Sequence, residues 1–286
     1  MFYQTYKTTI KNITRSKTFW FAVMLLFIIA LYEAIRGGYG YYDHQLNEVI
    51  MDTDPRYVMR YPITVQDVAN TCYSLLYYVM PIVSVIAAVS VLSRDYGDSF
   101  FEIEKTRGVK TLGYLTGRLA GLITVTFPVY ISACFLRFYW YVFSRGGIDG
   151  MGTAEMLADT IPRLIRDIVT AGFSCILLYI CLTYVVGSIF KNAVMGAAAG
   201  IGYVVAYYAA RFVVKSRIDP FYFDYLSPIP DKLRYYLHYY DTEWFEETIA
   251  SFETNLAKAM MCIGILLGVS LIYCTITYFR IRKRDV

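Results

Sequence analysis

Six apolar runs, each close to the length of a membrane-crossing helix, leave this sequence few folds to choose from. They fall at residues 18–35, 71–92, 119–143, 168–190, 193–214 and 257–279. A helix needs about 20 predominantly apolar residues to cross the hydrocarbon core of a bilayer. The 286 residues are 57% hydrophobic and 17% charged, more apolar surface than a water-soluble domain buries. The sequence therefore predicts an all-α integral membrane protein, a single transmembrane domain over 1–286 with six transmembrane helices.

The charges between the runs fall into two sets, as expected for loops on opposite sides of a membrane. Segments 1–17, 93–118, 191–192 and 280–286 carry fourteen basic and five acidic residues, whereas the other three loops carry ten basic and seventeen acidic residues. Lys and Arg concentrate in cytoplasmic loops. We therefore expect a multi-pass protein of the cell membrane with both termini in the cytoplasm.

The first 17 residues predict a helix that lies in the membrane interface. Apolar side chains from Phe2 to Ile13 fall within about a 100° arc of such a helix. Lys7, Lys11 and Arg15 form a basic row on a neighbouring face. A basic amphipathic helix of this kind binds the anionic inner leaflet. The alternative is an ordinary basic flank that only orients the first span.

The last outer loop, 215–256, predicts an extracellular helical insertion. Its aromatic stretch is interrupted by three prolines, which exclude a further span. Phe245, Ile249, Phe252 and Leu256 then recur at helical spacing, which predicts an amphipathic helix leading into the sixth span. An irregular outer loop is the alternative.

No catalytic or metal-binding pattern occurs in the sequence. The two histidines, His44 and His238, have no second ligand at metal spacing, and no two cysteines form a CxxC pair. Gly108-Val109-Lys110-Thr111 resembles the end of a phosphate-binding loop, but Val109 separates the glycine from the lysine. We therefore expect no enzyme activity, no metal and no bound cofactor, and charge sorted by membrane side does not indicate nucleic-acid binding.

The polar interval 93–118 lies between two apolar runs and carries five basic and four acidic residues. With the topology above it lies in the cytoplasm. Apolar residues up to Ile103 precede a charged turn, Gly108 interrupts the pattern, and Leu112 resumes it, which predicts helix, turn and helix. A short amphipathic helix that projects from a membrane fits the groove of a partner protein. The spans hold no mid-membrane charge for an ion relay, so any active transport draws its energy from such a partner.

The layout as a whole resembles the membrane (permease) subunit of a type-2 ABC exporter. It shares a basic interfacial helix, six spans, a polar helix between the second and third spans, and a helical insertion between the fifth and sixth. Positions comparable to the family's motif between the second and third spans are Asp95, Gly97, Ser99, Phe101, Glu102, Gly108-Val109-Lys110 and Gly117-Arg118-Leu119. The family's Pro-x-Ser step is absent, and Asp98 is an additional acid.

The resemblance implies an ATP-driven exporter that moves an amphipathic or hydrophobic cargo, such as a peptide, drug or lipid, outward. Two cytoplasmic ATPase subunits would bind ATP and Mg, and a second permease subunit would complete a homodimer or heterodimer. The coupling helix would dock on the ATPase through Asp95, Gly97, Phe101, Glu102, Glu104, Lys105, Arg107, Gly108 and Lys110. The smooth face of the fifth span, with Gly196, Gly200 and Gly202, would form the subunit interface; close packing within one chain is the alternative.

Other classes of protein compete with this interpretation. A secondary transporter or channel is disfavoured because the spans lack central charges and the sequence shows no inverted repeat. A membrane enzyme that acts on lipid is disfavoured because no His, Asp and Glu cluster at one face. A non-transporting immunity or sensing protein of the same fold is equally compatible with the sequence.

Overall fold

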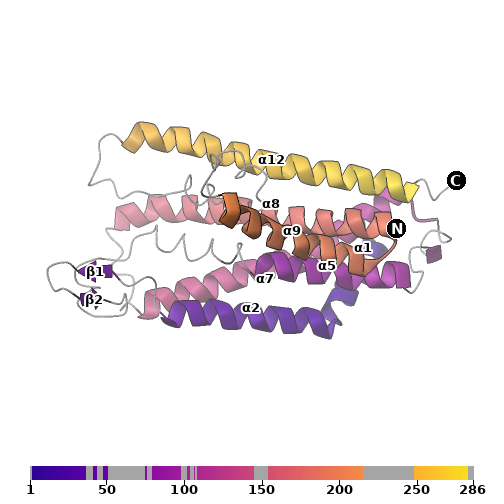
Figure 1. Cartoon of the computed structure of the whole chain (residues 1–286), viewed down its shortest axis with the longest axis horizontal. Helices are drawn as coiled ribbons and strands as arrows, with labels where there is room; N and C mark the ends of the chain where they lie inside the picture. The colour runs from indigo at the N-terminus through magenta and orange to yellow at the C-terminus, as the bar shows by residue number, and fades with distance from the viewer. Residues whose placement is uncertain are drawn as a thin grey trace.

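The computed structural model describes residues 2–36, 41–43, 48–50, 75, 79–97, 102–103, 106, 108–144, 154–214 and 248–282. Its helices are α1 (Phe2–Thr14), α2 (Lys17–Arg36), α5 (Met80–Gly97), α7 (Thr111–Ser144), α8 (Ala154–Phe190), α9 (Ala193–Val214) and α12 (Thr248–Arg282). The long helices run along one axis as an elongated bundle (Figure 1). The N-terminus and the C-terminal end of α12 lie at the same end of this bundle.

Two short strands, β1 (Tyr41–Asp43) and β2 (Glu48–Ile50), form an antiparallel hairpin. Tyr41 pairs with Ile50 and Asp43 with Glu48. The hairpin lies at the end of the bundle opposite to the termini (Figure 1). The all-α fold predicted from the sequence does not include this hairpin, although its Tyr, Val and Ile residues favour extended backbone. The fold is therefore helical throughout the bundle, with one small β element outside it.

Helix α8 is the central helix of the bundle. It packs against α5, α7, α9 and α12. Of its apolar stretch, 67% is buried, against 33% for α7 and 28% for α12. A helix that is apolar on all sides has to be covered by protein or lipid. α8 is therefore the most deeply buried of these three helices, while α7 and α12 keep broad apolar faces on the outside.

Three helices are long and apolar enough to cross a membrane in the described part of the chain. They are Thr111–Tyr139, Ile168–Phe190 and Met260–Arg282. A fourth span results if α1 and α2, which meet at an angle of 66°, count as one. Every predicted run overlaps one of the helices, but the described residues support three or four spans by length and composition.

The bend between α1 and α2 is built by local hydrogen bonds. The Ser16 hydroxyl accepts a bond of 3.2 Å from the Phe19 backbone N–H and so caps the start of α2. The Trp20 indole N–H donates to the Thr14 carbonyl, at the end of α1, over 2.7 Å. These contacts turn the chain between two helices that follow each other directly in the sequence. They set the angle between α1 and α2.

A tight turn at Lys191 brings α9 back along α8. Lys191 has a φ of 53°, and the Asn192 backbone N–H donates to the Gly187 carbonyl over 3.1 Å. This arrangement is the Schellman ending of a helix, with Lys191 in the position that glycine usually fills. The Asn192 side chain then accepts a bond of 2.8 Å from Val194 N–H and caps α9.

The predicted extracellular insertion 215–256 lies mostly outside the described residues. Its last part is described, because α12 begins at Thr248 and continues without a break to Arg282. The residues from 248 to 256 thus belong to the same helix as the predicted sixth span.

Candidate functional site

The two flanking helices extend into the polar interval 93–118 from both sides. α5 continues to Gly97 and α7 begins at Thr111, so the connection between them is 98–110. Within the connection, residues 102–103 and 106 are helical, and Gly108 has a φ of 76°. Glycine adopts this left-handed conformation at little cost because it has no Cβ. The chain therefore turns at Gly108, the residue at which the sequence pattern is interrupted.

Asp95 and Arg118 form an ion pair inside the bundle. Arg118 Nη2 donates to Asp95 Oδ1, and the two side chains are 0% and 2% exposed. Asp95 lies near the end of α5 and Arg118 in the first part of α7, so the pair joins the two helices that flank the connection. Removing one partner of a buried pair costs about 3–5 kcal/mol, because it leaves an uncompensated charge. The pair therefore holds α5 and α7 together at this end of the bundle.

Three further side chains surround the ion pair. Arg118 Nη1 donates to Thr9 Oγ1 of α1 over 2.9 Å, and Arg118 Cζ lies 5.0 Å from the centre of the Tyr114 ring, within the range of a cation–π contact. The phenol groups of Tyr114 and Tyr184 lie next to the Asp95 carboxylate. We call these five residues the Asp95–Arg118 cluster. It joins four helices, α1, α5, α7 and α8.

A face of small polar residues holds α1 against the bundle. Thr5, Thr9 and Asn12 recur at i, i+4 and i+7 and are all buried. Asn12 Oδ1 accepts a hydrogen bond of 2.7 Å from Arg94 Nη1 on α5. The aromatic residues of α1 lie on another side, where Tyr3 is 66% exposed. The inner face of α1 is therefore mostly polar, with Ile13 buried beside it. Phe2 and Tyr3, at the start of the apolar arc, are left for the surroundings of the protein.

Two glycines of α7 make room for α1. A Cβ at Gly121 would lie 2.7 Å from Thr9 Cβ, and a Cβ at Gly117 would lie 3.0 Å from Thr5 Cβ. Real Cβ atoms do not approach other heavy atoms as closely as the first of these distances. Small residues spaced four apart let two helices pack at close range. Gly117 and Gly121 thus explain why α1 packs so closely on the start of α7.

The C-terminal end of α12 contacts the same region. Ile281 and Tyr114 are both buried and form a small apolar cluster with Val109, which follows the turn at Gly108. The connection 98–110 is thereby attached on its α7 side to the last turn of α12. Together with α1, this places both ends of the described chain around the connection.

The predicted docking residues do not all lie on one exposed surface. Gly97, Glu102, Gly108 and Lys110 are exposed. Asp95 is buried in its ion pair with Arg118, so it is not available to contact a partner, and its assignment to the docking surface is corrected here. A carboxylate this deeply buried needs a charge partner, and the helical register places Arg118 beside it. Outside the described residues lie Phe101, Glu104, Lys105 and Arg107.

The predicted interface glycines divide between two roles. A Cβ at Gly196 would lie 2.7 Å from the Thr183 carbonyl oxygen, and a Cβ at Gly200 would lie 2.5 Å from Val85 Cγ2. These two glycines therefore pack α9 against α8 and α5 within the chain, and the expectation that they face a second subunit is corrected. For Gly196 and Gly200, the alternative stated for this face, close packing within one chain, is the one that the structure shows. Gly202 has no atom within 4 Å of its Cβ position and stays on an open face.

Sequence reasoning missed the members of the cluster other than Asp95. Arg118 had appeared only as part of the motif at the start of the third span, and Thr9 and Tyr184 had no assigned role. The polar row of Thr5, Thr9 and Asn12 was the signal that could have indicated an inward face of α1. It was overlooked because the apolar arc of the same helix is more conspicuous.

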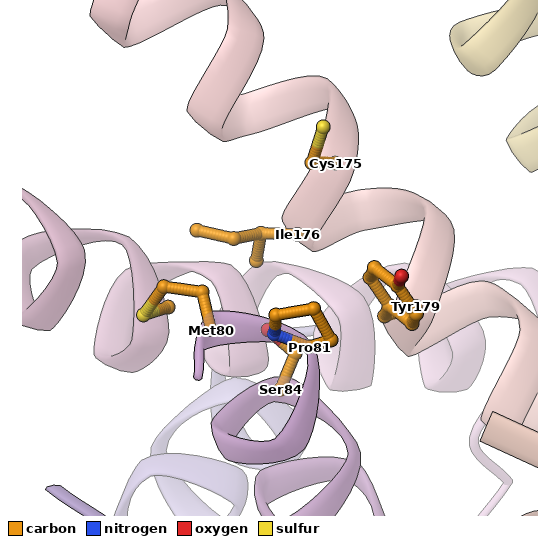
Figure 2. Close-up of a pocket in the computed structure, with 6 residues that line it drawn as sticks. All are labelled: Met80, Pro81, Ser84, Cys175, Ile176 and Tyr179. Atoms are coloured by element: carbon orange, nitrogen blue, oxygen red, sulfur yellow. The ribbon is translucent and has the colours of Figure 1, made fainter. Parts of the chain in front are cut away.

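A hollow at the start of α5 shows how tightly the core is packed. Met80, Pro81 and Ser84 of α5 face Cys175, Ile176 and Tyr179 of α8 around it (Figure 2). The space between these side chains does not admit a water molecule. This hollow is therefore a packing feature and not a binding site for a cargo.

The described residues contain no cluster of side chains suited to a metal ion. No group of three or more His, Cys, Asp and Glu side chains that could hold a metal ion occurs among them. The expected absence of a metal, a cofactor and enzyme activity remains a prediction.

A scan against protein-family models finds no match for this sequence, and a search of curated proteins finds none either. The resemblance to the membrane subunit of a type-2 ABC exporter therefore rests on the sequence layout alone.

Proposed function

We propose that this chain is the transmembrane permease subunit of an ATP-driven ABC exporter. In this proposal it has six membrane spans, lies in the cell membrane and keeps both termini in the cytoplasm. A separate ATPase, present in two copies, binds ATP and Mg and docks on the connection 98–110. A second permease subunit completes the pathway.

One observation supports this function more than any other. A short polar connection between two apolar helices is anchored on both sides by a buried ion pair, Asp95 with Arg118. A loop that only links two spans needs no such anchor, whereas a docking element has to transmit force. A push on the connection would be passed to α5 and α7 together, because the pair prevents them from separating.

The contacts of α1 and α12 support the same mechanism. Thr9 and Asn12 attach α1 to Arg118 and Arg94, and Ile281 attaches α12 to the residues after Gly108. A displacement of the connection would therefore reach four helices at once. Of the predicted docking residues on the connection, Glu102, Gly108 and Lys110 are exposed and can contact a partner.

A secondary transporter or channel is the second candidate. Such proteins place interacting charges near the middle of the membrane. The Asp95–Arg118 pair is buried, but Asp95 lies two residues before the end of α5, so the pair is close to the end of the bundle. A non-transporting immunity or sensing protein of the same fold would keep the ATPase contact and lack cargo flux.

The cargo class rests on composition. The chain has 29 Tyr and 18 Phe residues and no central charge in its predicted spans. An amphipathic or hydrophobic cargo, such as a peptide, drug or lipid, fits such a pathway better than a small ion.

The decisive experiment is purification of the tagged chain from its native membranes in mild detergent. We expect an ATPase subunit with a phosphate-binding loop to co-purify in about equal amount and to hydrolyse ATP. Glu102→Arg reverses an exposed charge on the connection and should lower the ratio of ATPase to permease about fivefold, the effect of about 1 kcal/mol.

The matched control is Glu155→Arg, the same reversal near the start of α8, at the far end of the bundle from the connection. It should leave the ratio unchanged. A wild-type preparation without any ATPase subunit would contradict the proposed function. Equal ratios for wild type and Glu102→Arg would contradict the docking surface.

A further inference from the structure

Two cysteines that lie far apart in the sequence are in direct contact inside the bundle. Cys181 of α8 and Cys274 of α12 are separated by 93 positions, and their Sγ atoms lie 3.2 Å apart. Both are free thiols. At this distance no atom fits between the two sulfurs, so they are neighbours without an intervening side chain.

The surroundings of the two thiols differ. Cys181 is 1% exposed, while Cys274 is half-buried on the outer side of the contact. The two helices pack closely against each other, which keeps the sulfurs in register (Figure 1). A disulfide has an S–S bond of about 2.05 Å, so the sulfurs need to approach by about 1.2 Å. Rotation of two side chains supplies a movement of this size without separating the helices.

We propose that Cys181 and Cys274 form a redox pair that closes to a disulfide between α8 and α12. The oxidant is a two-electron acceptor that dissolves in the membrane, such as a quinone. Two S–H bonds break and one S–S bond forms. The two thiols release two electrons and two protons, and the quinone takes them up as a quinol. Cys274 reacts first because it is the accessible sulfur, and the Cys181 sulfur then completes the bond.

The bridge acts as a lock between two helices. The last turn of α12 carries Ile281, which packs on Tyr114 and Val109 beside the connection 98–110. A bond between α8 and α12 therefore restrains the helix whose end touches that region. This inference concerns the two thiols and does not depend on whether the chain is an exporter.

The test uses the full chain in its native membranes. One sample is treated with diamide, a diazene that accepts two electrons and two protons and becomes a hydrazine, and a second sample is treated with dithiothreitol. Both are then denatured with excess maleimide and mapped by mass spectrometry. We expect diamide to remove two of the six maleimide-reactive thiols and to yield one linked peptide that contains Cys181 and Cys274.

Single-residue variants test whether the two lost thiols are Cys181 and Cys274. Cys181→Ser and Cys274→Ser should each abolish the loss. Cys175→Ser is the control: Cys175 is a buried thiol on the same helix, but it lies beside the hollow that Met80 and Pro81 of α5 also line (Figure 2). This variant should still lose two thiols.

The lock has a readout of its own. The oxidised wild-type protein should stay folded to a temperature several degrees higher than the reduced protein, since the bridge constrains the unfolded chain. No loss of thiols, a linked peptide with other cysteines, or an undiminished loss in Cys181→Ser would overturn the redox pair. Equal melting temperatures would overturn the lock.

Discussion

Asp95 and Arg118 show how one contact changes the meaning of a charged residue. In the sequence, both belong to a polar interval with near-balanced charge, which is typical of a segment in water. In the folded chain their side chains are removed from water and form an ion pair with each other. Burying either charge alone would cost several kcal/mol, so the two residues act as one unit. Arg118 also orders Thr9 and Tyr114 around it.

This pairing predicts a difference between single and double variants. Arg118→Met should destabilise the protein by about 3–5 kcal/mol, because Asp95 keeps a buried charge without its partner. Asp95→Leu combined with Arg118→Met removes both charges and should recover most of the loss. The measurement is the fraction of monodisperse protein after heating in detergent. If the double variant is less stable than the single one, the two side chains do not act as a pair.

Helix α1 is the element whose role changed most between sequence and structure. Its basic row and apolar arc predict a helix that lies in the membrane interface. The structure adds a third face, Thr5, Thr9 and Asn12, that packs on α7 and α5. Three faces on one short helix allow contact with protein, apolar surroundings and water at the same time. The close approach to α7 requires the glycines at 117 and 121.

The packing of α1 on α7 predicts opposite effects for two alanine substitutions in one helix. Gly121→Ala places a Cβ 2.7 Å from Thr9 Cβ and should cost about 1–3 kcal/mol through displacement of α1. Gly113→Ala meets no atom within 4 Å and should be neutral or stabilise by up to about 1 kcal/mol, the gain in helix propensity. Limited proteolysis between α1 and α2 reports the displacement. Equal cleavage of the two variants would show that α1 is not seated on Gly121.

At the scale of the whole molecule, the bundle has two unlike ends. One end collects α1, the connection 98–110, the Lys191 turn and the last turn of α12, while the β1–β2 hairpin lies at the other (Figure 1). The basic residues of these segments that the structure describes, such as Lys11, Lys110, Lys191 and Arg282, therefore gather at one end of the bundle. This arrangement is what an orientation set by basic loops requires.

The proposed orientation, with both termini in the cytoplasm, predicts which positions a membrane-impermeant maleimide reaches in intact cells. A cysteine at His44, between the two strands, should be labelled from outside. A cysteine at Lys110, exposed next to the Gly108 turn, should be labelled only after the membrane is permeabilised. Without permeabilisation the second variant serves as the control for leakage. The reverse pattern would place both termini outside the cell.

The helical bundle could be read from the sequence, and much of the site could not. The apolar runs anticipated α2, α5, α7, α8, α9 and α12 because each run has the length and composition of a helix. The hairpin of β1 and β2 escaped because three-residue strands produce no periodic signal. Gly108 was identified correctly as the turn, since a glycine inside a charged helical pattern is a local signal. The ion pair was missed because it depends on two helices meeting in one register.

The sequence by itself determined that the chain forms long apolar helices, with polar connections at their ends. Lipid offers no hydrogen bonds to a backbone, so an apolar run of this length has to satisfy its own peptide groups as a helix. Only the tertiary structure decided which residues meet. Thr9 and Arg118 lie 109 positions apart, and the two cysteines lie 93 positions apart. Asp95 and Arg118 also come from different helices, and no local pattern encodes such pairs. Their contacts follow from the rotation and depth of each helix in the bundle, which close packing sets through glycines such as Gly121 and Gly200.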